Sequence, residues 1–369
     1  MTRNAFPTRI SVTWASLLSL LAVVTLAVSG CAAGGGGGGG GGSSPGDNGQ
    51  QPTDDQTGQG GSGDQDQTPA DDSADPPSDD TGIGPLAPPD DQTPDATPTE
   101  PAVVTDIIWM DIDLRQILRV DIATQTVTPL VDTGGIDPSG MAIDAEAGKI
   151  YWAEQVRGQI LRADLDGQNV EELIPGGLSF PSSVALDLQR NKMYFSERFA
   201  NRIQRANLNG NNAGIILSQE LNGTQALLDP QAIAVDADAG RIYFADSGVD
   251  AIRASDLDGQ NLETVHTTLG SILFDLVIDP AGGKLYWTDR QANIIQRANL
   301  DGSELQTILD DGVSQPRGLA LDAPNRDLYF GDQATGNIRR VTINGSAVRT
   351  IISQGPVDPR ALVLVFDTP

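Results

Sequence analysis

The stretch Tyr286-Trp287-Thr288-Asp289 decides the fold, because versions of it recur throughout the C-terminal part of the chain. The second position of this quartet is always Trp or Phe, and its copies are Trp109, Trp152, Phe195, Phe244, Trp287 and Phe330. Successive copies are 43, 43, 49, 43 and 43 residues apart. A period of ~40–45 residues made of short apolar runs and turns is typical of β-propeller blades with four strands each. We therefore predict an all-β, six-bladed propeller.

Each repeat is predicted to form four short strands. In the second repeat, apolar runs occupy 141–144, 149–152, 160–165 and 172–174. Both faces of these strands are apolar, as expected for a sheet packed between two neighbours. An Asp-Gly or Asn-Gly dipeptide, which favours a tight hairpin turn, precedes the fourth strand at 166–167, 209–210, 258–259, 301–302 and 344–345.

The two ends of the repeat region complement each other. Pro316 opens the first strand of one repeat, and Pro359, 43 residues later, opens the run 360–365, which has no quartet after it. The first repeat, from Ile107 onward, has no such strand before it. We therefore expect the C-terminal strand to complete the first blade and leave no terminal sheet edge exposed.

Three motifs recur in register: the quartet at 286–289, the Ile-x-Arg-Ala-x-Leu-Asp-Gly run at 295–302 and the Pro-x-Gly-Leu-Ala-Leu-Asp run at 316–322. Together they resemble the class B (YWTD) repeats of low-density-lipoprotein-receptor relatives, over about residues 105–366. Phe replaces Trp in three repeats, Glu154 and Glu197 replace the quartet Asp, and no cysteine-rich module flanks the repeats. The resemblance implies a propeller that binds partners on one loop face, but it does not carry over endocytic-receptor biology.

The repeated side chains are interpreted as structural. One buried aromatic residue per blade is what packing between blades requires. We expect the quartet acids to accept hydrogen bonds from turn amides or from repeat arginines such as Arg162, Arg205 and Arg297. These acids are Asp111, Glu154, Glu197, Asp246, Asp289 and Asp332. The same interpretation holds for Asp144, Asp187, Asp236, Asp279 and Asp322.

Residues 1–30 are expected to be a lipoprotein signal peptide. Arg3 and Arg9 precede the apolar run 17–28, which is shorter than the ~20 residues that span a membrane. Val28-Ser29-Gly30-Cys31 resembles the bacterial lipobox, which implies lipid attachment at Cys31; an ordinary signal peptide is the alternative. We expect export and lipid anchoring in the cell envelope. Ala32 lacks the Asp that retains some lipoproteins at the inner membrane, which favours the outer membrane or cell surface.

Residues 31–104 are predicted to be a disordered linker, and 105–369 the propeller. The linker contains nine consecutive glycines, Gly34–Gly42. Residues 32–104 hold fourteen acids and no Lys or Arg, so this segment cannot bury enough surface to fold. The net charge is −27. Because the signal peptide adds two positive charges, about −15 remains on the propeller, and this sign disfavours nucleic acid as a partner.

The composition gives little support for catalysis. The single histidine, His266, is expected in an outer strand, and the single cysteine is the lipidation candidate. A nucleophile with a His base, or a zinc site of His and Cys, therefore lacks its residues. We predict a protein that is not an enzyme and has no cofactor or bound metal. The alternative is a metal-dependent, lactonase-like hydrolase or a lyase at the mouth of the axial channel, with Ca²⁺ held by Asp side chains.

Loop residues that do not repeat are candidates for partner contact, since Arg and aromatic side chains dominate protein-contact hot spots. We expect a monomer that binds a protein or glycan; scattered surface residues without a partner are the alternative. The segment Gly210–Pro230 is six residues longer than its equivalents, within 218–228, and is a further candidate. The candidate contact residues are Arg115, Arg157, Phe180, Arg198, Phe199, Phe274, Arg290, Arg317 and Arg360.

Overall fold

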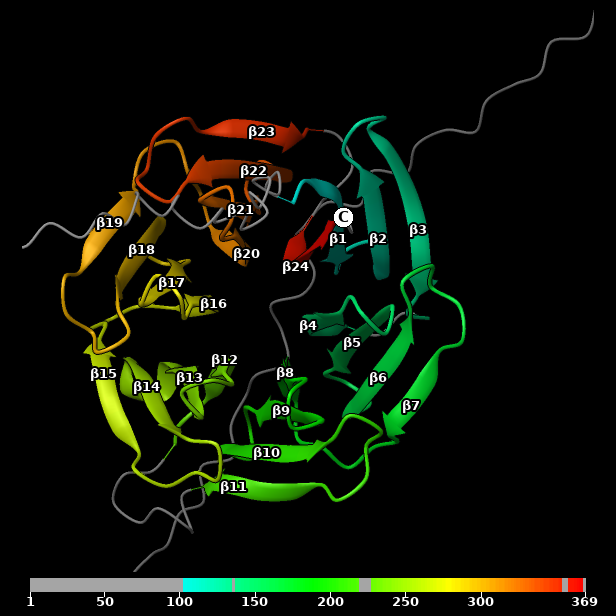
Figure 1. Ribbon diagram of the computed structural model, residues 1–369, viewed down its shortest axis with the longest axis vertical. Helices are drawn as coiled ribbons and strands as arrows, with labels where there is room; N and C mark the ends of the chain where they lie inside the picture. The colour runs from blue at the N-terminus through cyan, green and yellow to red at the C-terminus, as the bar shows by residue number, and fades with distance from the viewer. Residues whose placement is uncertain (1–101, 135–136, 219–226, 354–357, 368–369) are drawn as a thin grey trace, which may run out of the picture. The chain divides into compact units, whose positions relative to one another are not determined.

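The computed structural model describes residues 102–134, 137–218, 227–353 and 358–367. These residues form six antiparallel sheets of four strands, arranged around a central axis (Figure 1). The predicted six-bladed propeller is confirmed. Cys31, the expected signal peptide, most of the expected linker and residues 219–226 of the longer loop lie outside the described residues.

The blades follow one another in chain order, and each is given from its inner to its outer strand. Blade 1 contains β24 (Pro359–Phe366), β1 (Val104–Asp111), β2 (Gln116–Asp121) and β3 (Thr126–Asp132). Blade 2 contains β4 (Pro138–Asp144), β5 (Lys149–Glu154), β6 (Gln159–Asp164) and β7 (Glu171–Ile174). Blade 3 contains β8 (Pro181–Asp187), β9 (Lys192–Glu197), β10 (Arg202–Asn207) and β11 (Gly214–Ser218).

The second half of the ring repeats the pattern. Blade 4 contains β12 (Pro230–Asp236), β13 (Arg241–Asp246), β14 (Ala251–Asp256) and β15 (Glu263–Thr267), with one 3-10 turn, η2 (Ser247–Val249). Blade 5 contains β16 (Leu273–Asp279), β17 (Lys284–Asp289), β18 (Ile294–Asn299) and β19 (Gln306–Leu309). Blade 6 contains β20 (Pro316–Asp322), β21 (Asp327–Asp332), β22 (Asn337–Thr342) and β23 (Arg349–Ile352).

The ring closes as the repeat pattern predicts. β24 pairs antiparallel with β1, with Leu364 opposite Ile107 and Leu362 opposite Trp109. β1 begins at Val104, the last residue of the expected linker. The strands from the two ends of the propeller therefore lie in one sheet, and the inner strand of blade 1 comes from the C-terminus (Figure 1).

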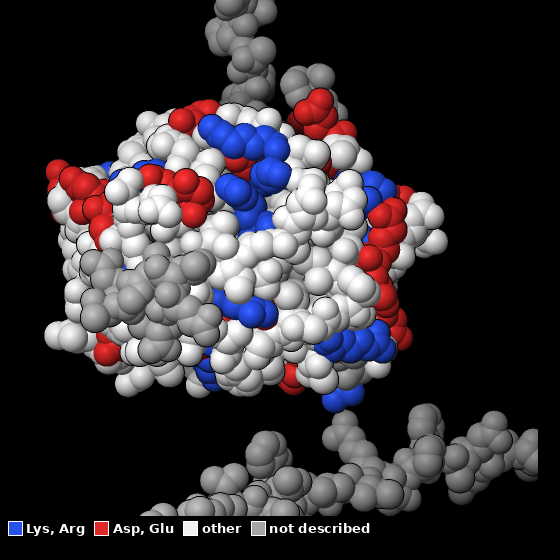
Figure 2. All heavy atoms as spheres, turned by 90° about the horizontal axis from the view of Figure 1, so that it is seen from below, with Lys and Arg blue, Asp and Glu red and all other residues white. Residues whose placement is uncertain are grey.

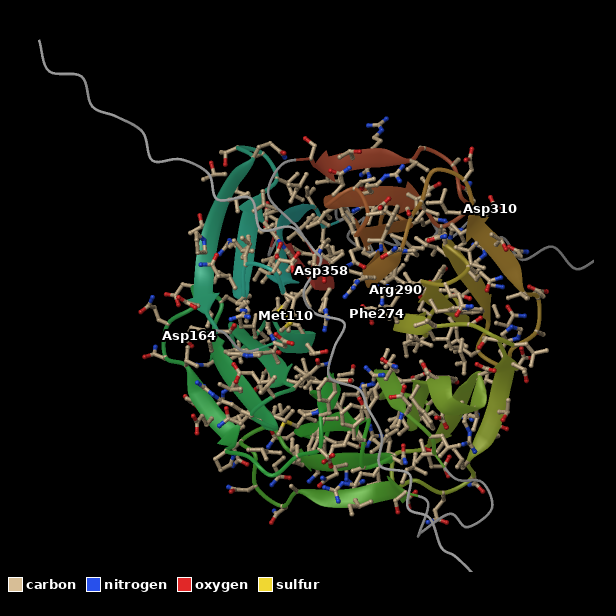
Figure 3. All side chains as sticks on the ribbon, turned by 180° about the vertical axis from the view of Figure 1, so that it is seen from behind. Met110, Asp164, Phe274, Arg290, Asp310 and Asp358 are labelled. Atoms are coloured by element: carbon tan, nitrogen blue, oxygen red, sulfur yellow. The ribbon has the colours of Figure 1, made fainter. Side chains whose placement is uncertain are left out.

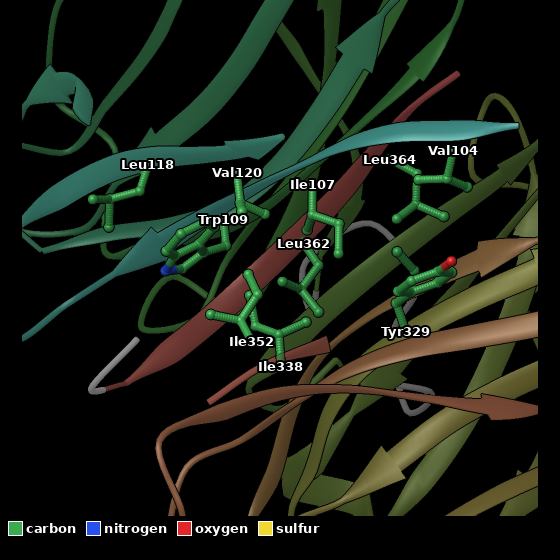
Figure 4. Packing of buried hydrophobic residues seen from close by; sticks show 11 residues of the cluster. Val104, Ile107, Trp109, Leu118, Val120, Tyr329, Ile338, Ile352, Leu362 and Leu364 are labelled. Atoms are coloured by element: carbon green, nitrogen blue, oxygen red, sulfur yellow. The ribbon is translucent and has the colours of Figure 1, made fainter. Parts of the chain in front are cut away.

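The hydrophobic core is divided into six clusters, each between two adjacent blades. In the cluster between blades 6 and 1, Trp109 packs with Tyr329, Ile338 and Leu362 (Figure 4). The other five clusters are built in the same way. Each contains the second quartet residue of one blade and the first quartet residue of the preceding blade. The second quartet residues are each 0% exposed. The quartet aromatic residues therefore join neighbouring blades.

The turn glycines also join neighbouring blades. At Gly302 the backbone has φ +81°, and a Cβ atom would lie 1.8 Å from the carbonyl oxygen of Val265 in the preceding blade. Gly210 and Gly259 face the same obstruction, at 2.1 and 1.9 Å. Glycine is needed here both for the left-handed backbone and because the turn touches the neighbouring outer strand.

A pair of substitutions separates these two requirements. Gly302→Ala combines backbone strain with the clash, whereas Gly283→Ala, at φ +65° with nothing within 4 Å, has strain alone. We expect Gly283→Ala to lower the free energy of unfolding by about 1–2 kcal/mol, and Gly302→Ala by about 2 kcal/mol more, the order of an overpacked core site. Urea denaturation of both variants measures the difference. Equal losses would show that contact with the preceding blade contributes nothing.

Candidate functional site at the axial mouth

The quartet acids are engaged in turns. Asp289 accepts hydrogen bonds at one oxygen from the amides of Gln291 and Ala292, at 2.9 and 3.0 Å. Asp246 accepts one from the amide of Leu228 at 2.9 Å. The acids that end the inner strands do the same; Asp144, for example, accepts from the amide of Ala147 at 2.9 Å. These carboxylates hold loops in place.

The repeat arginines do not make the contacts first expected of them. Arg162, Arg205 and Arg297 donate from Nη1 to turn carbonyls of the next blade, at 3.4, 3.0 and 2.7 Å. Other arginines reach quartet acids: Arg202 makes a two-point ion pair with Glu197, and Arg253 and Arg339 reach Asp246 and Asp332 at 3.1 and 3.2 Å. Arg253 and Arg339 stand one position earlier in the third strand, opposite Phe244 and Phe330. Successive residues of a strand point to opposite faces of the sheet. A shift of one residue therefore changes the partner of the arginine from a turn carbonyl of the next blade to a quartet acid of its own blade.

Two sets of loops share one end of the propeller, which we call the loop face. It consists of the loops between the second and third strands of each blade and the residues just before each inner strand. Backbone hydrogen bonds join the two sets: Arg198 N donates to Phe180 O at 3.2 Å, and Arg290 N donates to Ile272 O at 3.0 Å. All nine candidate contact residues lie in or beside these loops.

A cavity of about 480 Å³ runs along the axis, walled by the inner strands β4, β8, β12, β16, β20 and β24. Five of the candidate contact residues line it: Arg198, Phe274, Arg290, Arg317 and Arg360. In Figure 3, Phe274, Arg290 and Asp358 lie around the central opening, whereas Asp164 and Asp310 lie at the outer rim. The structure therefore gathers sequence-distant residues of the loop face at one mouth.

Arg317 is the most enclosed of these residues, with 4% of its surface exposed. Its Nε lies 3.1 Å from Asp358 and donates to Gln333 at 2.8 Å, and its guanidinium carbon lies 5.1 Å from the centre of the Phe274 ring. Burial lowers the pKa of Arg317 to about 10, although Asp358 opposes this shift. An arginine this deeply buried offers little surface to a protein partner, so its expected role as a surface contact does not fit its position.

The carboxylate of Asp358 serves two arginines. Arg360 Nε lies 3.8 Å from Oδ2, whereas Arg317 contacts Oδ1. Burial raises the pKa of Asp358 and lowers that of Arg360, because the pair is largely removed from water. Arg290 joins the same mouth and donates to Gln315 at 3.5 Å. Two guanidinium groups thus share one carboxylate, and Arg290 lines the same mouth.

Asp275 is the carboxylate of the cavity wall itself. Its oxygens accept hydrogen bonds from the amides of Leu276 and Leu319, at 2.9 and 2.8 Å. Burial raises the pKa of Asp275 to about 7, so a fraction of this group is protonated at neutral pH. The equivalent position in other inner strands holds a small residue: Gly140, Ser183, Ala232, Gly318 and Ala361.

A second cluster extends from the mouth onto the outer loop face. Phe199 is 67% exposed and stacks on Phe180 with ring centres 4.5 Å apart. Arg198 lies over Phe180 at 5.8 Å and makes a two-point ion pair with Asp229, at 2.5 and 2.9 Å. The ion pair and the ring contact hold the exposed Phe199 in a defined position.

Arg115 and Arg157 lie apart from both clusters. Arg115 is exposed in the loop of blade 1, and the side chain of Arg157 is 54% exposed, 4.0 Å from Glu154. Elsewhere on the propeller, many oppositely charged side chains are paired, as in Arg119–Asp106 and Lys149–Asp164. On the side seen in Figure 2, basic residues gather near the middle and acidic residues lie mainly toward the margins.

Two residues central to the mouth were missed by sequence reasoning. Asp275 could have been noticed as the one acid at a strand position that is otherwise small. Asp358 resembles Asp137 and Asp229, which also precede an inner-strand proline, so the pattern gave no sign that it pairs with Arg317.

The described residues contain no group of three or more His, Cys, Asp or Glu arranged to hold a metal ion. His266 lies in β15, half-buried, with its ring centre 5.6 Å from that of Trp287. Burial lowers its pKa, and the cavity wall does not include it.

Two segments of the propeller, 191–237 and 283–323, match the family model of the low-density lipoprotein receptor repeat class B. The chain carries class B repeats. Each matching segment of this class B propeller runs from a quartet to the inner strand of the following blade, the part of the repeat that forms one blade-to-blade joint.

The chain is similar in structure to several solved proteins, and the first of those that follow shares its fold. A chain in the crystal structure of a nidogen/laminin complex has a TM-score of 0.62 and 19% identity, covering 70% of this chain and 97% of that one. A Bacteroides thetaiotaomicron VPI-5482 protein of unknown function has a TM-score of 0.49 and 15% identity, covering 61% and 62%. Streptogramin B lyase has a TM-score of 0.47 and 21% identity, covering 60% and 70%.

No curated protein matches this chain significantly. In the part of the chain that the structure describes, no helix has the length and apolar character needed to cross a membrane.

Asp275→Asn tests the cost of placing a carboxylate in the cavity wall. Asp275 titrates at about pH 7 in the folded protein but near 4 when unfolded. The folded state therefore holds its proton to higher pH, and this group makes the wild type less stable as pH rises between the two values. Because the cavity is open to solvent, we expect a smaller effect than the whole pKa difference would give. Between pH 5 and pH 8, the free energy of unfolding of the variant should rise relative to that of the wild type by on the order of 1–2 kcal/mol.

Urea denaturation at pH 5 and pH 8 measures this gain. Asp113→Asn, which removes an exposed carboxylate of the loop face, is the matched control and should show no such gain. A gain as large in the control as in Asp275→Asn would contradict the assignment.

Proposed function

We propose that this protein is a lipid-anchored, extracytoplasmic binding module that engages a protein partner through the loop face. The observation that carries the proposal is the distribution of exposed apolar side chains. Among the described residues, seven of twelve large exposed hydrophobics belong to the loop face: Leu114, Val156, Phe199, Leu228, Val249, Leu269 and Ile272. Apolar exposure concentrated on one face of a folded domain marks an interaction site more often than exposure spread over the whole surface does.

Phe199 is the strongest anchor on this face. It is a large aromatic side chain held by Phe180 and Arg198 before any partner arrives, so little conformational entropy is lost when it is buried. Aromatic and arginine side chains together are the usual composition of a hot spot. The similar propeller in the nidogen/laminin structure belongs to a protein complex, which supports a protein over a glycan as the partner.

Site-specific photo-crosslinking tests the chosen face. A photoreactive amino acid replaces Phe199 in the full chain, expressed in its native envelope, and Leu188 in a second variant. Leu188 is a matched control because it belongs to the same blade, is 47% exposed and lies at the opposite end, between β8 and β9. We expect a discrete higher-mass adduct from position 199 that is absent from position 188. Adducts of equal yield at both positions, or none at either, would count against the loop face.

The anchor is tested separately. If Cys31 carries the lipid, metabolic labelling with a clickable fatty acid should label the wild type, and Cys31→Ser should lose the label. Two or more acyl chains hold a protein firmly on a bilayer, so the wild type should sediment with membranes and the variant should not. Retained labelling of Cys31→Ser would overturn the assignment.

A further inference from the structure

Positive charge is in excess at the mouth of the cavity. Among the residues that line the cavity, Arg198, Arg290, Arg317 and Arg360 are basic and Asp275 alone is acidic. Arg317 and Arg360 share the carboxylate of Asp358, at 3.1 and 3.8 Å, and the charge of Arg290 acts on both of these arginines. Asp113 and Asp137, which do not line the cavity, act in the opposite sense. The neighbouring guanidinium groups help to lower the pKa of Arg317, after burial itself. Like charges repel strongly where water is scarce, so an additional anion at this mouth would relieve the repulsion.

Hydrogen-bonding capacity is unused at the same place. Nη1 of Arg317 and Nε of Arg360 have no hydrogen-bond partner among the described residues, and neither has Oγ of Ser182 on the opposite wall. The side chain of Arg317 is 5% exposed. A buried donor left without an acceptor costs about 1–3 kcal/mol. Oδ1 of Asp358, at the same place, is an acceptor that likewise has no hydrogen-bond partner among the described residues, and all of these atoms are buried. A ligand that brings acceptor oxygens would therefore engage the arginine donors once their side chains turn toward the cavity.

The cavity becomes apolar below its charged mouth. Five of the six inner strands have, at their sixth position, an aliphatic residue that lines the cavity and is partly exposed. These residues are Ile143, Leu186, Val235, Ile278 and Leu321. The ring lies four residues along the strand from the position of Arg317, or roughly 13 Å at the rise of a β-strand. Aliphatic side chains that face an internal cavity favour an apolar occupant.

We propose that the axial cavity binds a small carboxylate with an aliphatic body, its head held by Arg290, Arg317 and Arg360 and its body in the apolar ring. The volume of about 480 Å³ falls within the ~300–1,000 Å³ of small-molecule sites. This inference goes beyond the proposed protein binding, because Phe199 lies outside the cavity wall and the two sites can fail separately.

Asp275 opposes the ligand less than its charge suggests. Its two oxygens accept hydrogen bonds from Leu276 and Leu319. Because its pKa is raised to about 7, the neutral form is substantially populated near pH 7. The arginines therefore outweigh the one acid among the residues that line the cavity.

Isothermal titration calorimetry on the purified full chain tests the proposal with three probes: octanoate, acetate and octanol. We expect one octanoate per chain. Acetate lacks the aliphatic body and octanol lacks the charge, so each should bind at least about tenfold more weakly, the loss of roughly 1.4 kcal/mol or more. No octanoate binding, or equal affinity for octanol, would overturn the proposal; equal affinity for acetate would overturn the role of the apolar ring.

Variants locate the site. Arg290→Gln keeps a side chain of similar length and removes no ion pair that the structure records, so we expect a folded protein with about tenfold weaker octanoate binding, as for loss of one charged partner. Arg115→Gln removes an exposed charge of the same face away from the cavity and should bind like wild type. Circular dichroism and thermal melting verify folding of each variant.

Unchanged octanoate affinity in a folded Arg290→Gln protein, or an equal loss in Arg115→Gln, would overturn the assignment. Phe199→Ser should keep octanoate binding. If octanoate binding is retained but crosslinking at position 199 fails, the proposed protein partner is contradicted and the proposed cavity ligand is not.

Discussion

Every blade of this propeller is apolar on both faces, and the whole architecture depends on giving each face a neighbour. A sheet of this kind is stable only between two others, so the row of blades must return to its start. The pairing of β24 with β1 achieves this closure. The cluster around Trp109 and Tyr329 then buries the last two faces. An unclosed row would leave both an apolar face and a strand edge open to other chains.

The fold was predictable because its determinants are local and repeated. The spacing of the quartets gave the number of blades, and the strand at 360–365, which lacks a quartet after it, gave the closure. Contacts between blades were not predictable at the same level. Whether an arginine meets a quartet acid or the next blade depends on a single position along the strand, as Arg253 and Arg297 show. The spacing of motifs alone does not report that choice.

The candidate site was predictable as a face but not as a cavity. The resemblance to class B repeats placed the arginines and aromatic residues in the loops at one end, and the structure has them there. That Arg317 is buried, and that it pairs with Asp358, depends on how closely β20 and β24 approach around the axis. This distance is set by the packing of all blades together, so it appears only when the ring is assembled.

The shifted arginine of blade 4 makes one joint of the ring unlike its neighbours. In blades 2, 3 and 5 the arginine at this strand position reaches a turn carbonyl of the following blade. In blade 4 the position holds Ala254, and the arginine stands one residue earlier, where it bonds within its own blade. The joint between blades 4 and 5 therefore has apolar packing but not this hydrogen bond from an arginine to a turn carbonyl. Blades 6 and 1 also keep the equivalent arginine within the blade, where Arg340 pairs with Asp327 and Arg119 with Asp106. Under load, the closed toroid should therefore loosen first at one of these three joints, for which the described residues show no arginine contact to the following blade.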